Sequence, residues 1–206
     1  MTAETDDLDE ALAQARVGDE AGFLELWRSL QPRLLRFLRV LRCDDPDDVA
    51  SETWLQVVRD LHTFKGSEED FRRWLFTVGR HRAIDAARAR MRRRASPVAD
   101  GLDSLADAQM VEDQVLDGIS VQKAIAMLVG LSPDQAEAVA LRVIAGLDTP
   151  AVADILGKSP GAVRVALHRG LRALAADPRV RALAADPGPD NQAPDPGLLT
   201  PRRCAG

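Results

Sequence analysis

The stretch 71-FRRWLFTVGRHRAIDAARARMRRR-94 sets the character of the chain. Apolar side chains recur in it at the i, i+3, i+4, i+7 spacing of a buried helix stripe, at Phe71, Trp74, Leu75 and Val78. The same stretch carries nine arginines and one acid, Asp85, in a chain whose formal net charge is −5. A local charge of about +8 in an acidic protein predicts contact with a polyanion, because an ordinary solvated face mixes both signs of charge.

The composition bounds what the chain can be. Its 206 residues allow one domain or two small ones, and 46% hydrophobic residues suffice for a core. No apolar run approaches the ~18 residues of a membrane span, and the acidic residues 1–10 do not resemble a secretion signal. Cys43 and Cys204 lie far apart without metal-ligand spacing. We therefore expect a cytoplasmic protein with no membrane span, metal or cofactor.

Residues 8–94 are predicted to form one helical domain, whose first helix begins near Leu8. Apolar stripes indicate helices on both sides of Pro32, which we expect to separate them. A further helix over 47–62 is expected to turn Trp54, Val57 and Val58 inward, and a turn over 64–70 precedes the arginine-rich helix.

The rest of the chain divides into three parts. Residues 95–120 contain six acids and no base, which predicts a flexible acidic linker. Residues 121–176 are predicted to form a second small helical domain, within which 132-SPDQ-135 has the form of a capping box. Residues 177–206 hold six of the twelve prolines and are predicted to be disordered. The expected fold class is all-α, with two domains, a linker and a tail.

Residues 149–175 are predicted to form a helix-turn-helix, with Gly157 in the turn. The second helix has an apolar stripe that includes Val163 and Leu167, and its other side is polar and basic. Such a helix suits the major groove of DNA, because polar and basic side chains then face base edges and phosphates. The candidate contacts are Ser159, Arg164, His168, Arg169 and Arg172.

Two sets of short motifs together resemble a known family. The first half contains 32-PRLLRF-37, 47-DDVASETW-54, 64-FKG-66 and 71-FRRWL-75. The second half contains 131-LSP-133, 140-ALR-142, 146-GL-147, 155-ILG-157 and 167-LHR-169. In this order and spacing they resemble the bacterial RNA polymerase sigma factors of the extracytoplasmic-function (ECF) type, within the sigma-70 family.

The resemblance implies a role for each half. The 47–60 helix would bind the clamp helices of the largest subunit of core RNA polymerase through Asp48, Glu52 and Gln56. The second half would meet the flap of the second-largest subunit and recognise the −35 promoter element. The first half would bind the −10 element as a melted strand, whose flipped bases can stack on aromatic rings. The residues expected at the −10 element are Phe64, Lys65, Arg73, Phe76, Thr77, Arg80 and Arg88, with Arg73 and Arg80 on an open face. Of these, Arg88, together with the arginines that follow it up to Arg94, would touch the duplex just upstream.

The resemblance also implies promoter DNA and an anti-sigma protein as partners, and no enzymatic activity. Two alternatives stay open from the residues alone. A stand-alone helix-turn-helix regulator would bind duplex DNA tightly without polymerase. A recombinase would need a nucleophile or metal-binding carboxylates beside the basic face, and the sequence shows neither.

Overall fold

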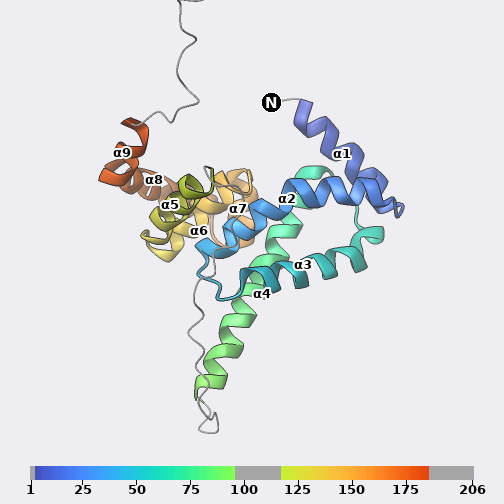
Figure 1. Cartoon of the computed structure of the whole chain (residues 1–206), viewed down its shortest axis with the longest axis horizontal. Coiled ribbons are helices and arrows are strands. Elements are labelled where there is room, and N and C mark those ends of the chain that lie inside the picture. The colour runs from blue at the N-terminus through green and yellow to red at the C-terminus, as the bar shows by residue number, and fades with distance from the viewer. Residues whose placement is uncertain (1–2, 96–116, 186–206) are drawn as a thin grey trace, which may run out of the picture.

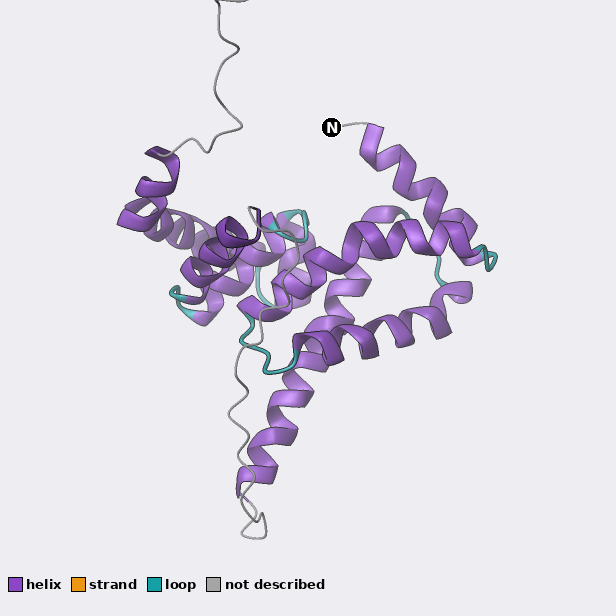
Figure 2. Ribbon diagram, viewed as in Figure 1, coloured by secondary structure: helices purple, strands orange, loops and turns teal. Residues whose placement is uncertain are grey.

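The computed structural model describes residues 3–95 and 117–185, and the regular elements in these ranges are helices (Figure 1, Figure 2). The first half contains α1 (Ala3–Arg16), α2 (Glu20–Val40), α3 (Pro46–Asp60), the 3-10 helix η1 (Leu61–Thr63) and α4 (Glu68–Ala95). The second half contains α5 (Asp117–Val129), α6 (Pro133–Val143), α7 (Thr149–Leu156), α8 (Pro160–Ala176) and α9 (Pro178–Ala185). The predicted all-α fold class is confirmed. Most of the predicted linker, residues 96–116, lies outside the described residues.

Short polar residues start several of these helices. Asp45, Asp148 and Ser159 each occupy the N-cap position before a proline-containing first turn. Each side chain accepts a backbone hydrogen bond three residues ahead, at distances from 2.8 to 3.2 Å. Such a cap stabilises a helix by about 1 kcal/mol, because the first N–H groups have no partner inside the helix. Ser132 is the N-cap of α6, but its side chain forms no cap hydrogen bond, so the predicted capping box is incomplete.

α2 is one helix of 21 residues with Pro32 inside it, so the expected break at Pro32 was wrong. Leu26, Leu30, Leu34 and Phe37 line its inner face and are fully buried. This apolar stripe continues on the same side of the helix before and after the proline. Burial of the whole stripe therefore outweighs the one backbone hydrogen bond that proline cannot donate.

α4 crosses α2 and α3 at Gly79, where the helices approach closely. A Cβ atom at Gly79 would lie 2.8 Å from Leu34 Cδ1 and 3.8 Å from Thr53 Oγ1. The Thr53 hydroxyl is buried at this crossing and donates to the Val49 carbonyl at 2.7 Å. The crossing holds the first turns of α4 against the other helices, while its last turns project from the body (Figure 1).

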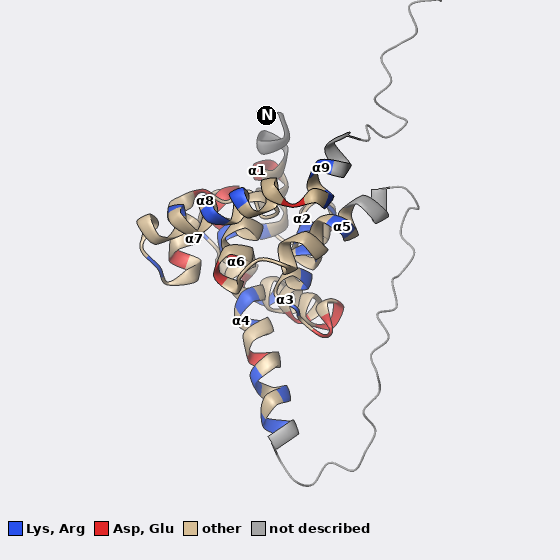
Figure 3. Cartoon of the chain, turned by 90° about the vertical axis from the view of Figure 1, so that its left-hand side faces the viewer, with Lys and Arg blue, Asp and Glu red and all other residues tan. Residues whose placement is uncertain are grey.

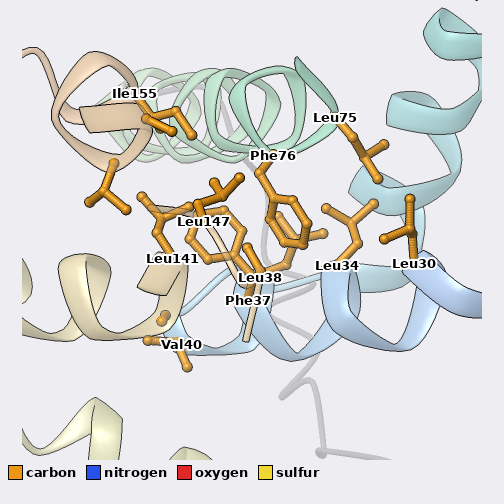
Figure 4. Close-up of a cluster of buried hydrophobic side chains, with 14 of the residues drawn as sticks. Leu30, Leu34, Phe37, Leu38, Val40, Leu75, Phe76, Leu141, Leu147 and Ile155 are labelled. Carbon is orange, nitrogen blue, oxygen red and sulfur yellow. The ribbon is translucent and has the colours of Figure 1, made fainter. Parts of the chain in front are cut away.

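The two halves pack against each other rather than lying apart. α2 contacts α5 and α6 as well as α3 and α4, and α4 also contacts α7. Figure 4 shows Phe37, Leu38 and Phe76 of the first half beside Leu141 and Leu147 of the second, and all five are fully buried. We call this contact between the halves the seam. One hydrophobic core thus includes residues of both predicted domains.

The ends of the described chain differ from expectation. Helix α1 begins at Ala3 rather than near residue 8. Helix α9 occupies 178–185, so the disorder predicted from residue 177 does not hold for this segment. Residues 186–206 lie outside the described ranges. Among the helices of 3–95 and 117–185, none is both long enough and apolar enough to cross a membrane.

Candidate nucleic-acid and polymerase interfaces

The outer face of α3 carries the three residues expected to bind polymerase. Asp48 and Glu52 are exposed, and Gln56 is partly exposed. Arg82 of α4 reaches two of them, with Nη1 3.1 Å from Glu52 Oε2 and Nη2 3.0 Å from Gln56 Oε1. Arg82 therefore links both side chains to α4. Sequence reasoning missed it, because no sequence pattern places residue 82 beside residues 52 and 56.

Two apolar side chains lie exposed on the same helix. Leu55 is 64% exposed and Val58 is 53% exposed, so the expectation that Val58 points inward was wrong. Trp54, Val57 and Leu61 already fill the inner stripe of this segment and are buried. Exposed apolar groups beside hydrogen-bonding side chains are typical of a surface that binds protein.

The loop before α4 presents Phe64 and Lys65. The Phe64 ring is partly buried and lies nearly parallel to Trp74, with centroids 5.3 Å apart and an interplanar angle of 16°. It also meets Phe71 edge-on at 5.7 Å. Lys65 is exposed. An anchored but accessible ring beside a free lysine is suited to stacking a base near a phosphate.

Ser67 and Asp70 cap the start of α4 through reciprocal hydrogen bonds. The Asp70 carboxylate accepts from Ser67 N at 3.2 Å and from Ser67 Oγ at 3.1 Å, and it pairs with Arg73 at 2.9 Å. The hydrogen bond from the Ser67 backbone is the main cause that lowers the pKa of Asp70 below its ordinary value. The hydroxyl of Ser67 and the charge of Arg73 act in the same direction.

Two arginines expected to bind the −10 strand contact acids of the second half, and Thr77 lies between them on α4. Arg80 donates to both carboxylate oxygens of Glu137, from Nε to Oε1 at 2.9 Å and from Nη2 to Oε2 at 3.3 Å. Arg73 Nη1 lies 3.5 Å from Asp154 Oδ2. Thr77 Oγ1 donates to the Arg73 carbonyl at 2.7 Å. The expectation of an open face was therefore wrong for Arg80, because an acid of α6, which the sequence did not single out, engages it.

Phe76 is a core residue, which corrects its prediction as a base contact. Its side chain is fully buried at the seam, with its ring edge-on to Phe37 at 5.4 Å and 73° (Figure 4). The sequence pattern of one apolar stripe predicts that α4 is buried on one side only. α4 also contacts α7, so its buried arc is wider than the Phe71 and Leu75 stripe suggests.

The last turns of α4 bear the exposed basic residues predicted to meet duplex DNA. Arg88, Arg92 and Arg93 are exposed, and Figure 3 shows basic bands along this projecting end. Arg88 Nη1 lies 3.4 Å from Asp85 Oδ1, but both side chains remain about two-thirds exposed or more, at 68% and 72%. This weak surface pair leaves the arginine available to a phosphate.

The predicted helix-turn-helix is formed by α7 and α8. Gly157 ends α7 in the left-handed conformation, with φ 62° and ψ 35°, and turns the chain into α8. Val163, Leu167 and Gly170 form the buried side of α8. The other side exposes the predicted basic contacts, which are Arg164, His168, Arg169 and Arg172. Ser159 is also exposed, but its hydroxyl accepts the N-cap hydrogen bond from Ala162 N at 3.2 Å.

The described residues include neither a cluster of metal ligands nor an activated thiol. Among them, no three His, Cys, Asp or Glu side chains gather closely enough to hold a metal ion. Cys43 is a free, half-buried thiol, and burial is the main cause that raises its pKa. A protonated thiol is a poor nucleophile. The charge of α4 and α8 instead suits the recognition of a nucleic acid.

Comparison with known sequences defines the class of protein. Residues 26–93 match the family described as Sigma-70 region 2, and residues 122–174 match the family described as Sigma-70, region 4. The first match runs from within α2 to near the end of α4, and the second runs from within α5 to near the end of α8. Fold and sequence thus assign the chain to the sigma-70 class.

Individual relatives narrow the class further. The chain is 31% identical to the ECF RNA polymerase sigma factor SigD of Mycobacterium tuberculosis over 180 residues, which cover 84% of this chain and 85% of SigD. It is 29% identical to the ECF RNA polymerase sigma factor BldN of Streptomyces coelicolor, over 81% of this chain and only 64% of BldN. The chain belongs to the ECF RNA polymerase sigma factors.

A solved structure shares the fold. The sigma factor RpoE from Bartonella quintana, in its complex with the anti-sigma factor NepR, has a TM-score of 0.58 and 22% sequence identity. The match covers 81% of this chain and 98% of RpoE.

Proposed function

We propose that the chain is a non-enzymatic initiation factor that works in the cytoplasm, binds core RNA polymerase and directs transcription from specific promoters. One observation carries this proposal. This chain, which belongs to the sigma factor family, has an exposed basic face on α8 and a basic projecting end on α4. It also has an exposed face on α3 with polar and apolar side chains. The first two surfaces suit DNA and the third suits a protein partner.

The α3 face is the proposed polymerase contact. Asp48, Glu52 and Gln56 would bind the clamp helices of the largest subunit, with Leu55 and Val58 supplying apolar contact beside them. The second half would bind the flap of the second-largest subunit. This arrangement would carry the DNA-binding helices to the promoter on the polymerase.

The −10 element would be held as a melted strand at the start of α4. Phe64 is the candidate for stacking a base, which contributes about 1–3 kcal/mol per base. Lys65, Arg73 and Arg80 would hold phosphates, and Arg88 would meet the adjoining duplex. Thr77 lies on the same stretch of α4 as a polar contact.

The −35 element would be read by α8 in the major groove. Arg164 and His168 lie one turn apart on the exposed side, and Arg169 and Arg172 continue it. Ser159 would contribute through the helix N-terminus that its hydroxyl caps. An anti-sigma protein is the expected regulator, since the related RpoE was solved with one.

Transcription in vitro with core RNA polymerase tests this function. We expect promoter-dependent transcripts from a genomic template library when the chain is added, and none from core polymerase alone. Arg164→Ala should weaken promoter selection about 10-fold or more by removing a base or phosphate contact, while binding to core polymerase stays intact. Absence of any promoter-dependent product would overturn the proposal.

A further inference from the structure

The two halves are joined by ion pairs that use the proposed strand-binding arginines. Glu137 of α6 accepts two hydrogen bonds from Arg80, and only 20% of the Arg80 side chain and 16% of the Glu137 side chain are exposed. A two-bond arginine–carboxylate pair has the geometry of an arginine–phosphate pair. Arg73 makes a second, looser ion pair across the seam, with Nη1 3.5 Å from Oδ2 of Asp154 of α7, and the Asp154 side chain is 71% exposed.

Two further contacts hold the second half in place. Arg42 follows α2 in a left-handed conformation, with φ 56°, and its Nη2 donates to the Val129 carbonyl at 2.7 Å. Val129 is the last residue of α5, where a cation is favourable because the helix dipole ends in partial negative charge. The α6–α7 loop lies against Arg72, whose Nη1 would be 2.8 Å from a Cβ atom at Gly146.

The apolar part of the seam is incompletely packed. A pocket of about 270 Å³, partly open to solvent, lies between Val40 and Ala83 of the first half and Leu131 and Ala136 of the second, with Glu137 at its border. Apolar side chains that line such a pocket make fewer contacts across the seam than they would in a filled core. The polar contacts across the seam therefore carry a larger share of closing the halves than they would in a well-filled interface.

We propose that Glu137 and Asp154 act as built-in substitutes for promoter phosphates and hold the free chain in a closed state. In this state carboxylates engage Arg80 closely and Arg73 loosely, so these arginines become fully available to the −10 strand only when the halves separate. The closed state leaves the exposed face of α3 and the basic face of α8 uncovered. The α3 face can thus bind polymerase before the arginines of α4 become available to the −10 strand. The masking part of this inference rests on the proposed function of α4.

The closed state lowers the apparent affinity for a single strand, because that affinity falls in proportion to the open fraction of the chain. Removing the charge of Glu137 raises the open fraction and frees Arg80. We expect Glu137→Gln to tighten binding of a fluorescein-labelled, mixed-sequence single-stranded DNA about 10-fold, measured by anisotropy. The salt dependence should steepen by about 0.7 per arginine freed.

The chain offers a matched control on the same helix. Asp134 of α6 pairs with Lys158 at 2.6 Å, within the second half, and does not cross the seam. Asp134→Asn removes the same charge as Glu137→Gln. We expect it to leave strand binding close to that of the unaltered chain, so any excess effect at Glu137 comes from the seam and not from net charge.

The closed state itself is measured without DNA, by small-angle X-ray scattering of the free chain. Glu137→Arg, which places two cations together, should increase the radius of gyration, and adding Arg80→Glu should reverse the increase by restoring a pair of opposite charges. Circular dichroism checks that both variants remain helical; if Glu137→Arg is not folded, Glu137→Gln serves for the scattering measurement.

Two results would overturn the inference. One is a radius of gyration that does not change in a folded Glu137 variant, which would show that the pair does not close the chain. The other is an opened chain that binds the strand no more tightly than Asp134→Asn, which would show that nothing was masked. Neither depends on transcription, so failure of the proposed function would appear separately, as a lack of promoter-dependent product with core polymerase.

Discussion

The carboxylate of Asp70 accepts two hydrogen bonds from Ser67 and an ion pair from Arg73, and its pKa is lowered. A carboxyl group with a lowered folded-state pKa stabilises the fold above its ordinary pKa, and this stabilisation is lost as the pH falls through the folded-state value. We predict that Asp70→Asn lowers the free energy of unfolding at pH 7, and that its difference from the unaltered chain shrinks as the pH falls below about 4. Urea unfolding across this pH range measures both effects.

Glu69 provides the control for this prediction, because it lies in the same first turn of α4. Glu69→Gln removes the same charge from the helix N-terminus but leaves the Ser67 hydrogen bonds to Asp70 in place. An equal loss with the same pH dependence in both variants would show that helix-dipole charge, and not the cap, is responsible.

Phe76 and Phe64 test the distinction between a core ring and a contact ring. Phe76 is fully buried at the seam, whereas Phe64 is partly exposed in the loop before α4. We predict that Phe76→Ala lowers the free energy of unfolding by about 3–5 kcal/mol, and that Phe64→Ala costs about half of that or less. Phe64→Ala should still weaken single-strand binding. Equal stability losses in urea unfolding would contradict this assignment.

At the scale of elements, the crossing of α4 over α2 depends on Gly79. Alanine there would bring its Cβ to 2.8 Å from Leu34 Cδ1, although alanine is otherwise the better helix former. We predict that the clash dominates and that Gly79→Ala lowers the free energy of unfolding by about 1–2 kcal/mol. Thermal unfolding measures the change.

Gly161 of α8 is the matched glycine. The nearest atom to a Cβ there is Ser159 Oγ at 3.9 Å, so alanine meets no obstruction. Gly161→Ala should raise stability by up to about 1 kcal/mol, because the unfolded chain loses freedom and the helix gains propensity. Changes of the same sign in both variants would show that helix propensity, not the crossing, governs Gly79.

The helices of this chain follow local rules, which is why the sequence predicts most of them. Asp148 and Ser159, each followed by a proline in the first turn, and Gly157 between them mark α7 and α8 without reference to the rest of the fold. The break expected at Pro32 does not occur. The hydrogen bond that proline lacks is a local property that the sequence shows, whereas the burial of Leu30 and Leu34 on either side depends on contacts from other helices.

At the scale of the whole molecule, the predicted binding face of α8 could be found from sequence, since one helix carries both its buried and its basic side. The state of Arg80 could not, because its partner Glu137 is 57 residues away on another helix. The family matches cover residues 26–93 and 122–174 as separate units, and they give no information on the contact between the two. Long-range pairing of this kind leaves no periodic signal in either segment.

The seam predicts how the chain unfolds. The three tryptophans, Trp27, Trp54 and Trp74, all lie in the first half, so their fluorescence reports on that half alone. Circular dichroism reports on the helices of both halves. Because one core joins the halves, we predict that the two probes give coincident urea transitions in the unaltered chain, as a two-state process requires.

Weakening the seam should separate the two transitions. In Glu137→Arg the second half loses its pair with Arg80 and is expected to unfold at a lower urea concentration, so that the circular dichroism transition broadens and begins before the fluorescence changes. Asp134→Asn, whose pair with Lys158 lies inside the second half, should keep the probes coincident. Separate transitions already present in the unaltered chain would mean that the seam adds too little free energy to couple the halves, and that the closed state is only one of several arrangements the chain adopts.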